Sequence, residues 1–132
     1  MAKTQRLDIV TPEKVVFSEE IDFVVAPGAD GELGILPEHA PLVTALKVGT
    51  LRVQQGGKFF KVAVSGGFME VKNSRIVVLA DTAERADQID VERAKAAKQR
   101  AEQRLNSKGS EIDVHRAEIA LHKAINRIKA AE

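Results

Sequence analysis

The sequence contains no cysteine, tryptophan or tyrosine, and only five of its 132 residues are phenylalanine. Without cysteine there can be no disulfide scaffold, thiolate metal site or cysteine nucleophile. No apolar run approaches the ~18 residues that a membrane-spanning helix needs, and the first residues lack the apolar segment of a signal peptide. The sequence therefore predicts a cytosolic chain with one compact domain or two small ones.

The net charge of the chain is also small, +1, because 20 Lys and Arg residues nearly balance 19 Asp and Glu residues. This balance disfavours a dedicated nucleic-acid-binding protein. All prolines and phenylalanines precede Val71, whereas the sequence after Asp87 is rich in Ala, Lys, Arg and Glu. We therefore expect two domains, residues 1–86 with net charge −1 and residues 87–132 with net charge +2.

The first domain is predicted to be mainly β, an antiparallel sandwich or barrel, because short apolar segments alternate with Gly and Pro turn signals. Gln55-Gly56-Gly57 and Asn73-Ser74 are predicted hairpin turns, and a long loop is expected from Pro27. The expected strands are Arg6–Val10, Val15–Phe17, Ile21–Val25, Val43–Leu46, Thr50–Val53, Phe59–Val64, Phe68–Val71 and Ile76–Leu79.

The second domain is predicted to be an antiparallel two-helix hairpin. Acidic residues from Asp87 to Asp90 mark the start of the first helix, Lys108-Gly109 its end, and Ser110 to Asp113 a capping box for the second. The apolar stripe of the first helix is rich in alanine, which buries little area. The hairpin should therefore be held more weakly than the sandwich.

Motifs of common enzymes are missing. The sequence has no phosphate-binding Gly-x-x-x-x-Gly-Lys-Ser/Thr loop, no Gly-x-Ser-x-Gly elbow and no His-Glu-x-x-His metal pair, so we predict that it is not an enzyme. His115 and His122 lie two helical turns apart, too far to bind one metal ion without further ligands, and solvated histidines are the simpler interpretation. For His39 a loop or capping role is the better interpretation.

Basic residues repeat in both predicted helices with spacings of seven and four. They are Arg93, Arg100 and Arg104 in the first helix and Arg116, Lys123 and Arg127 in the second. Each helix therefore carries a basic stripe that could bind a polyphosphate or a carboxylate-rich partner. The commoner explanation from spacing alone is a solvated charged face with local pairs such as Asp90 with Arg93.

Several ordered motifs resemble one family, the epsilon subunit of bacterial F-type ATP synthase. They are Gly31-Glu32-Leu33-Gly34-Ile35-Leu36-Pro37-Glu38-His39-Ala40-Pro41-Leu42, Val64-Ser65-Gly66-Gly67-Phe68-Met69-Glu70-Val71, Ala80-Asp81-Thr82-Ala83-Glu84 and Ile89-Asp90-Val91-Glu92-Arg93-Ala94. The likeness extends over the whole chain, and several motifs in order are more specific than any one of them.

The resemblance implies a non-catalytic rotor subunit of the central stalk. In this family the sandwich binds the gamma subunit and sits on the ring of c subunits, which couples ring rotation to the catalytic head. The loop from Glu32 to His39 would face the c ring. The hairpin either folds or extends into the head, where its basic residues meet acidic segments of the beta subunits and block ATP hydrolysis. The chain would be peripheral to the cell membrane on its cytoplasmic side.

Some bacterial members bind ATP to the folded hairpin as a regulatory signal, without hydrolysing it. Carried over by position, the ATP site would consist of Glu84, Ile89, Asp90, Arg93, Ala94, Arg100, Lys123 and Arg127. The guanidinium groups would neutralise phosphates, and Asp90 would orient Arg93 or accept a bond from the base or sugar. Lys123 stands where tight-binding members have Arg, and the sequence leaves open whether Mg²⁺ assists.

Two other classes of protein remain as alternatives. One is a small basic nucleic-acid-binding module, but the hairpin lacks aromatic residues and carries interleaved Glu92, Glu102 and Glu118. The other is a stand-alone ATP-sensing domain outside any complex. Copurification with the gamma subunit separates that alternative from the rotor subunit.

Overall fold

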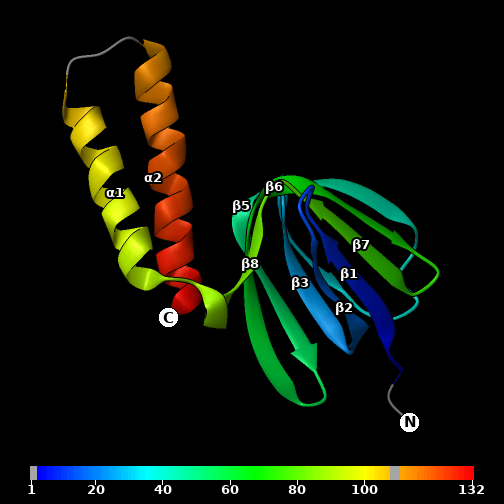
Figure 1. Cartoon of the computed structure of the whole chain (residues 1–132). Coiled ribbons are helices and arrows are strands. Elements are labelled where there is room, and N and C mark those ends of the chain that lie inside the picture. Colours follow the sequence, from blue (N-terminus) through cyan, green and yellow to red (C-terminus); the bar gives the residue numbers. More distant parts are fainter. Residues whose placement is uncertain (1–2, 108–110) are drawn as a thin grey trace. The chain divides into compact units, whose positions relative to one another are not determined.

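The computed structural model describes residues 3–107 and 111–132, with the side chains of Glu111 and Ile112 left out (Figure 1). The chain divides into two compact units, residues 1–85 and 86–132, which are taken separately below. Among the described residues, no helix is both long and apolar enough to cross a membrane.

The first unit consists of eight strands in one continuous hydrogen-bonded sheet that folds into a sandwich. Its order is β2-β1-β7-β6-β5-β3-β4, and β8 pairs with β6. The mainly β sandwich predicted from the sequence is confirmed. The strands are β1 (Gln5–Val10), β2 (Val15–Ile21), β3 (Phe23–Gly28), β4 (Gly31–Ile35), β5 (Leu42–Gln55), β6 (Lys58–Lys72), β7 (Arg75–Ala80) and β8 (Ala83–Arg85).

Several predicted strand boundaries are wrong. The pairs of strands expected on either side of Lys47 and of Gly66 are single long strands, β5 and β6, because the interruptions bend a strand without ending it. The long loop expected from Pro27 contains β4, which forms a hairpin with β3. The pairing is not wholly antiparallel either, since β1 and β7 run parallel. That contact joins residues about 70 positions apart, and local pattern cannot reveal it.

Both predicted hairpin turns are present. The β5–β6 turn has φ of 57° at Gly56 and 80° at Gly57, and the β6–β7 turn has φ of 52° at Asn73 and 56° at Ser74. Two successive left-handed residues define the two-residue turn whose twist matches that of antiparallel strands. These turns fix the register of the β5–β6 and β6–β7 pairings.

A kink at Gly66 and Gly67 lets β6 contribute to both layers of the sandwich. Before it, Val62 to Val64 pair with β8; after it, residues 67–72 pair with β7. Gly66 and Gly67 have φ of 98° and 120°. A Cβ on Gly67 would lie 2.0 Å from the carbonyl oxygen of Leu79, so no side chain fits there. The backbone N–H of the neighbouring Ser65 donates to the carbonyl oxygen of Thr82, and the two hydroxyl groups share a hydrogen bond, which holds the adjoining segment.

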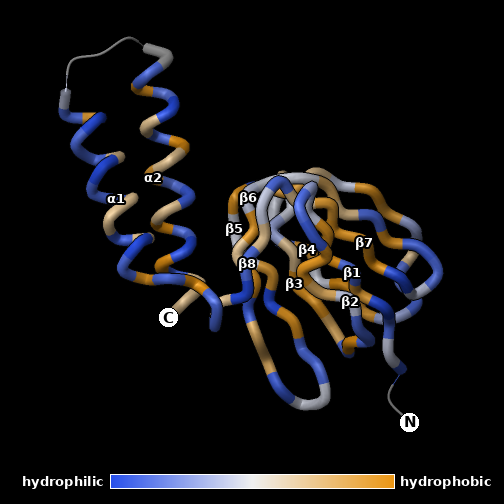
Figure 2. The backbone as a smooth tube through the Cα atoms, in the orientation of Figure 1, coloured by the Kyte–Doolittle hydropathy of each residue, from blue (hydrophilic) through white to orange (hydrophobic). Residues whose placement is uncertain are grey.

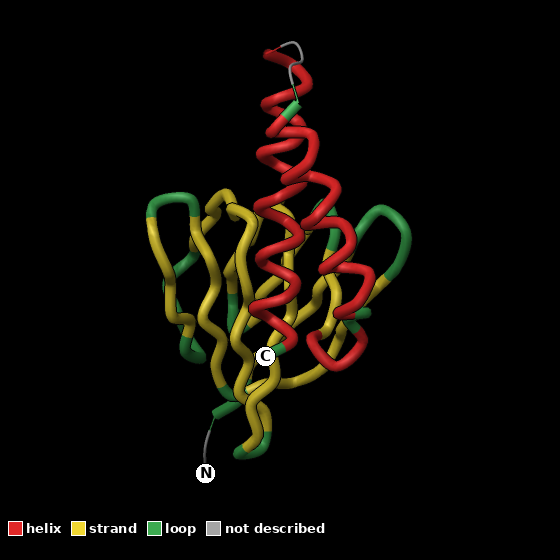
Figure 3. The backbone as a smooth tube through the Cα atoms, turned by 90° about the vertical axis from the view of Figure 1, so that its left-hand side faces the viewer, coloured by secondary structure: helices red, strands yellow, loops and turns green. Residues whose placement is uncertain are grey.

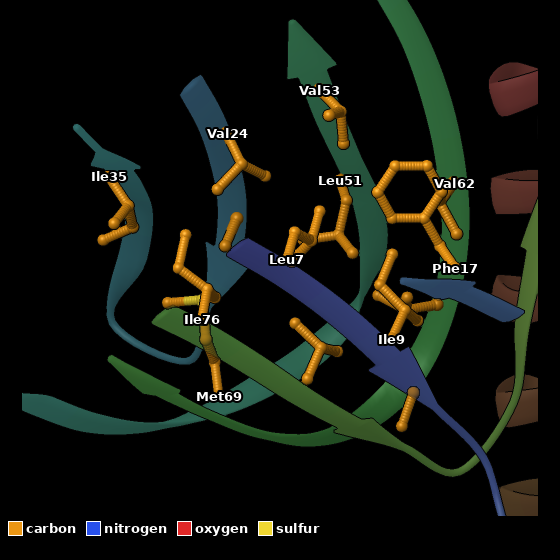
Figure 4. Packing of buried hydrophobic residues seen from close by; sticks show 14 of the residues in the cluster. Leu7, Ile9, Phe17, Val24, Ile35, Leu51, Val53, Val62, Met69 and Ile76 are labelled. Atoms are coloured by element: carbon orange, nitrogen blue, oxygen red, sulfur yellow. The ribbon is translucent and has the colours of Figure 1, made fainter. Parts of the chain in front are cut away.

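The core lies between the layers and draws apolar side chains from seven strands, β1 to β7 (Figure 4). Leu7, Ile9, Leu51, Met69 and Ile76 are fully buried in it. Burial of one such side chain stabilises the fold by ~1.5–3 kcal/mol. Figure 2 shows the corresponding alternation of apolar and polar residues along the strands. No residue of the second unit belongs to this cluster.

A buried carboxylate ties three strands together on the outer side of the sheet. Asp8 of β1 accepts hydrogen bonds from Ser18 of β2 and from Arg75 of β7, and Arg6 lies 3.4 Å away. These hydrogen bonds, first that of Ser18, and the two guanidinium charges hold the pKa of Asp8 below its usual value against the opposing effect of burial. The sandwich therefore holds Asp8 in its ionised form.

The short strand β8 fixes the end of the first unit. It pairs with Val62 to Val64 of β6, and the guanidinium carbon of Arg85 lies 4.5 Å from the centre of the Phe60 ring. Phe60 in turn packs on Phe17, with ring centroids 5.2 Å apart. A cation over an aromatic face is stabilising, so the chain is anchored up to Arg85.

The second unit is the predicted helical hairpin, with a 3₁₀ turn (η1, Ala86–Gln88) and two helices, α1 (Val91–Asn106) and α2 (Glu111–Ala131), that run side by side (Figure 3). The first helix begins later than predicted because Asp90 caps it, its carboxylate accepting a hydrogen bond from the Arg93 backbone N–H at 3.0 Å. The end signal at Lys108-Gly109 and the capping box from Ser110 lie outside the described residues.

Candidate functional site

The two helices meet along a seam of alanines. Ala94 and Ala101 of α1 and Ala117 and Ala124 of α2 are almost fully buried. The two alanines of each helix are seven residues apart. Because the helices are antiparallel, Ala94 lies opposite Ala124 and Ala101 lies opposite Ala117. Methyl groups allow close approach but contribute little buried area. The flanking residues Val91, Leu105 and Ile128 are only partly buried.

Both basic stripes lie on one face of this hairpin. On each helix a basic residue directly precedes each seam alanine: Arg93 and Arg100 on α1, and Arg116 and Lys123 on α2. Two antiparallel helices that face each other through equivalent positions are related by a two-fold rotation about an axis perpendicular to the hairpin plane. That rotation keeps each face on the same side, so the two stripes form one basic face, defined by Arg93, Arg100, Arg104, Arg116, Lys123 and Arg127.

The cations of the basic face are largely left without acidic partners. Local pairs occur elsewhere on α1, where Lys95 lies 4.0 Å from Glu92 and Lys98 lies 3.8 Å from Glu102. Within residues 3–107 and 111–132, no ion pair involves Arg93, Arg100, Arg104, Arg116 or Lys123. The side-chain pair of Asp90 with Arg93, suggested by their spacing, is not formed because the Asp90 carboxylate caps the helix.

The structure distributes the eight predicted ATP-site residues unevenly. Arg93, Arg100 and Lys123 are exposed on the basic face, and Arg127 is half-buried on it. Ala94 belongs to the buried seam, and Ile89 is buried next to the Asp90 cap. Glu84 lies on β8 in the first unit.

The sandwich carries an exposed apolar patch that the sequence did not single out. Phe68 of β6 pairs with Leu79 of β7 and with Ala45 of β5, and Val43 lies two residues along on the same face. Phe68, Leu79 and Val43 are 60%, 56% and 69% exposed. These four residues form what we call the outer patch. Strict alternation predicts that they face away from the core, but only the strand register brings them together.

The predicted ring-facing loop, Glu32 to His39, is only partly loop, because Glu32 to Ile35 belong to β4 and residues 36–39 follow that strand. Glu32 pairs with Arg52 of β5 at 3.0 Å, and Glu38 pairs with Lys3 at 2.9 Å. Beside it is an open cleft of about 450 Å³, lined by Lys3, Asp22, Phe23, Leu36, Pro37 and Gln54. His39 stays in the loop, with Nδ1 2.7 Å from the carbonyl oxygen of Ala40.

Comparison with protein families decides between the classes of protein left open by the sequence. Residues 4–86 match the beta-sandwich domain of the ATP synthase delta/epsilon chain, and residues 87–132 match its long alpha-helix domain. The chain belongs to the ATP synthase delta/epsilon chain family. It is therefore a non-catalytic subunit of the ATP synthase, as the lack of enzyme motifs predicted.

Relatives and solved structures agree with this assignment. The epsilon chain of Pelotomaculum thermopropionicum is 61% identical over 129 residues, covering 98% of this chain and 96% of that protein. The epsilon chain of Desulfitobacterium hafniense is 51% identical over 99% of this chain and 98% of its own length. A chain of the Euglena gracilis mitochondrial ATP synthase, in a structure of OSCP, F1 and c-ring, superposes with a TM-score of 0.85 at 25% identity, covering 100% of this chain and 84% of that chain.

A chain in the central stalk and c-ring structure of the Tetrahymena thermophila mitochondrial ATP synthase is similar at lower identity. That chain has a TM-score of 0.66 at 13% identity, with 98% of both chains covered, and shows the fold alone. Together the comparisons confirm the family inferred from the sequence motifs.

Proposed function

We propose that this chain is a rotor subunit of the central stalk, whose sandwich binds the gamma subunit and the ring of c subunits. The outer patch supports the contact with gamma, since an exposed group of large apolar side chains on a sheet face is typical of a protein interface. The Euglena chain that is similar to this one comes from a structure that includes the c-ring. Rotation of the ring would reach the catalytic head through this unit.

The loop from Glu32 to His39 and its cleft are the proposed contact with the c ring. Leu36 is 61% exposed at the cleft, so the loop presents an apolar side chain between the charged pairs of Glu32 and Glu38. In this arrangement the chain would be peripheral to the cell membrane, on its cytoplasmic side.

The second unit would regulate ATP hydrolysis. The observation that carries this proposal is the basic face, six cations on one side of a hairpin whose seam is made of alanine. When the hairpin opens and extends, these cations would bind acidic segments of the beta subunits in the catalytic head. Guanidinium groups bind carboxylates through paired hydrogen bonds, which favours that partner.

ATP would act as the opposing signal by binding only the folded hairpin. Arg93, Lys123 and Arg127 would hold its phosphates, with Arg100 further along α1 and Ile89, Asp90 and Ala94 at the helix start. Such a ligand shifts the population of states by its difference in affinity for them. Family membership favours this role within the synthase over a stand-alone sensor.

Removal of residues 87–132 should raise ATP hydrolysis by the reconstituted complex while leaving assembly intact. The sandwich keeps its whole core, because no core residue comes from the hairpin. Hydrolysis is measured by phosphate release from two complexes, one with the full chain and one with the shortened chain, each containing the same amount of the subunit. Unchanged hydrolysis would show that the hairpin does not inhibit.

ATP binding is tested on the full chain with Arg93→Gln. Loss of one charge-assisted contact should weaken ATP binding by at least roughly tenfold, as measured by titration calorimetry. Lys95→Gln removes the same charge from α1 away from the basic face, where Lys95 lies near Glu92, and should leave affinity unchanged. An absence of ATP binding by the unsubstituted chain at millimolar nucleotide would rule out the sensor role, and equal losses in both variants would place the site elsewhere.

A further inference from the structure

The hairpin contains the same six-residue motif twice. Ile89-Asp90-Val91-Glu92-Arg93-Ala94 recurs as Ile112-Asp113-Val114-His115-Arg116-Ala117, with one difference, Glu92 against His115. The repeat continues beyond the motif. A shift of 23 residues places Arg93, Arg100 and Arg104 on Arg116, Lys123 and Arg127, and the seam alanines Ala94 and Ala101 on Ala117 and Ala124.

The repeat makes the basic face two-fold symmetric, with two equivalent clusters of three cations. Because Ala94 lies opposite Ala124, Arg93 falls between Lys123 and Arg127, and these three define the first cluster. Because Ala101 lies opposite Ala117, Arg116 falls between Arg100 and Arg104, and these three define the second cluster. Arg93 and Arg104 are eleven residues apart on α1, about 16 Å along the helix axis.

The second cluster consists only of arginines. Arg100, Arg104 and Arg116 are all exposed, and none of them forms an ion pair within the described parts of the chain. Arg100 and Arg104 repel each other at a spacing of four residues. One carboxylate stands at an equivalent place beside each cluster, Asp90 for the first and Asp113 for the second. Three planar guanidinium groups suit phosphate oxygens better than three lysines would.

We propose that the second cluster is a phosphate-binding site and that the basic face binds one linear inorganic polyphosphate across both clusters. A triphosphate is too short to engage cations spread over about 16 Å, whereas a longer chain of phosphates carries charge along its whole length. An extended acidic peptide matches the folded hairpin less well, because its side chains alternate between opposite sides. The proposal does not rest on ATP binding, since it requires no recognition of adenine.

The test compares a long linear polyphosphate with tripolyphosphate on the full chain, by titration at fixed ionic strength. We expect the long chain to bind at least roughly tenfold more tightly, equivalent to ~1.4 kcal/mol. The double variant Arg104→Gln/Arg116→Gln should lose this tenfold difference, while tripolyphosphate still binds the first cluster. The matched double variant Lys95→Gln/Lys98→Gln removes the same charge from residues near Glu92 and Glu102 and should keep the difference.

Three outcomes would overturn the proposal: equal affinity of the unsubstituted chain for both phosphate chains, equal losses in the two double variants, or equally tight binding of an oligoglutamate of the same charge. The ATP proposal is separable by the same titrations. If ATP fails to bind but the polyphosphate difference is found, only the ATP sensor is wrong; if ATP binds and the difference is missing, only the second cluster is wrong.

Discussion

Substitution of Gly67 by alanine is expected to destabilise the sandwich strongly. The added Cβ would lie 2.0 Å from the Leu79 carbonyl oxygen and 2.8 Å from the Ala80 Cα, both of them backbone atoms that cannot rotate away. The residue also has φ of 120°, which is strained for any side chain. We expect the free energy of unfolding to fall by about 4 kcal/mol or more, because losses of this size arise from severe steric clashes and backbone strain.

The matched control is Gly57→Ala in the β5–β6 turn. Gly57 has φ of 80°, but nothing lies within 4 Å of its Cβ position. That substitution should cost only the left-handed backbone penalty, ~1–2 kcal/mol. Urea unfolding followed by circular dichroism of the β signal measures both. Similar losses in the two variants would mean that the close approach of β6 to β7 does not matter.

Charge placed on the outer patch should abolish binding to the gamma subunit without harming the fold. Phe68 and Leu79 are cross-strand neighbours and largely exposed, so Phe68→Glu/Leu79→Glu removes no core contact. Buried at an interface, each new carboxylate would lose its hydration without a partner, a cost of several kcal/mol. The tagged chain should therefore no longer copurify with gamma from membranes.

Phe59→Glu provides the comparison, because Phe59 is 70% exposed but lies near the β5–β6 turn, outside the outer patch. It should copurify with gamma as the unsubstituted chain does. Thermal unfolding of all variants must be alike for the comparison to hold. Retained binding by the double variant, or loss with Phe59→Glu, would place the gamma contact on another surface.

Local chemistry explains which parts of the fold could be predicted. Gly56-Gly57 and Asn73-Ser74 form the expected turns because left-handed backbone conformations are encoded within two residues. The same rule failed at Gly66 and Gly67, where glycines bend β6 within the sheet and do not end it. The parallel pairing of β1 with β7 depends on partners about 70 positions apart, which no local pattern records.

The same division applies to the hairpin. Its basic stripes were predictable because helical periodicity fixes which residues share a face. The capping role of Asp90 could not be predicted, because a carboxylate near a helix start can cap the helix, pair with Arg93 or bind a ligand. The structure shows that it caps the helix. Helical periodicity does not tell which apolar residues are buried most deeply: the seam alanines are almost fully buried, whereas Leu105 and Ile128 are only partly buried.

The anchoring of Arg85 limits how far the hairpin can travel. Pairing of β8 with β6 and the stacking of Arg85 on Phe60 hold the chain up to that residue, and α1 begins at Val91. The six steps between these residues can extend to about 20 Å at most. The start of α1 can therefore lie no more than about 20 Å from Arg85. Any larger displacement requires β8 to lose its pairing with β6 first.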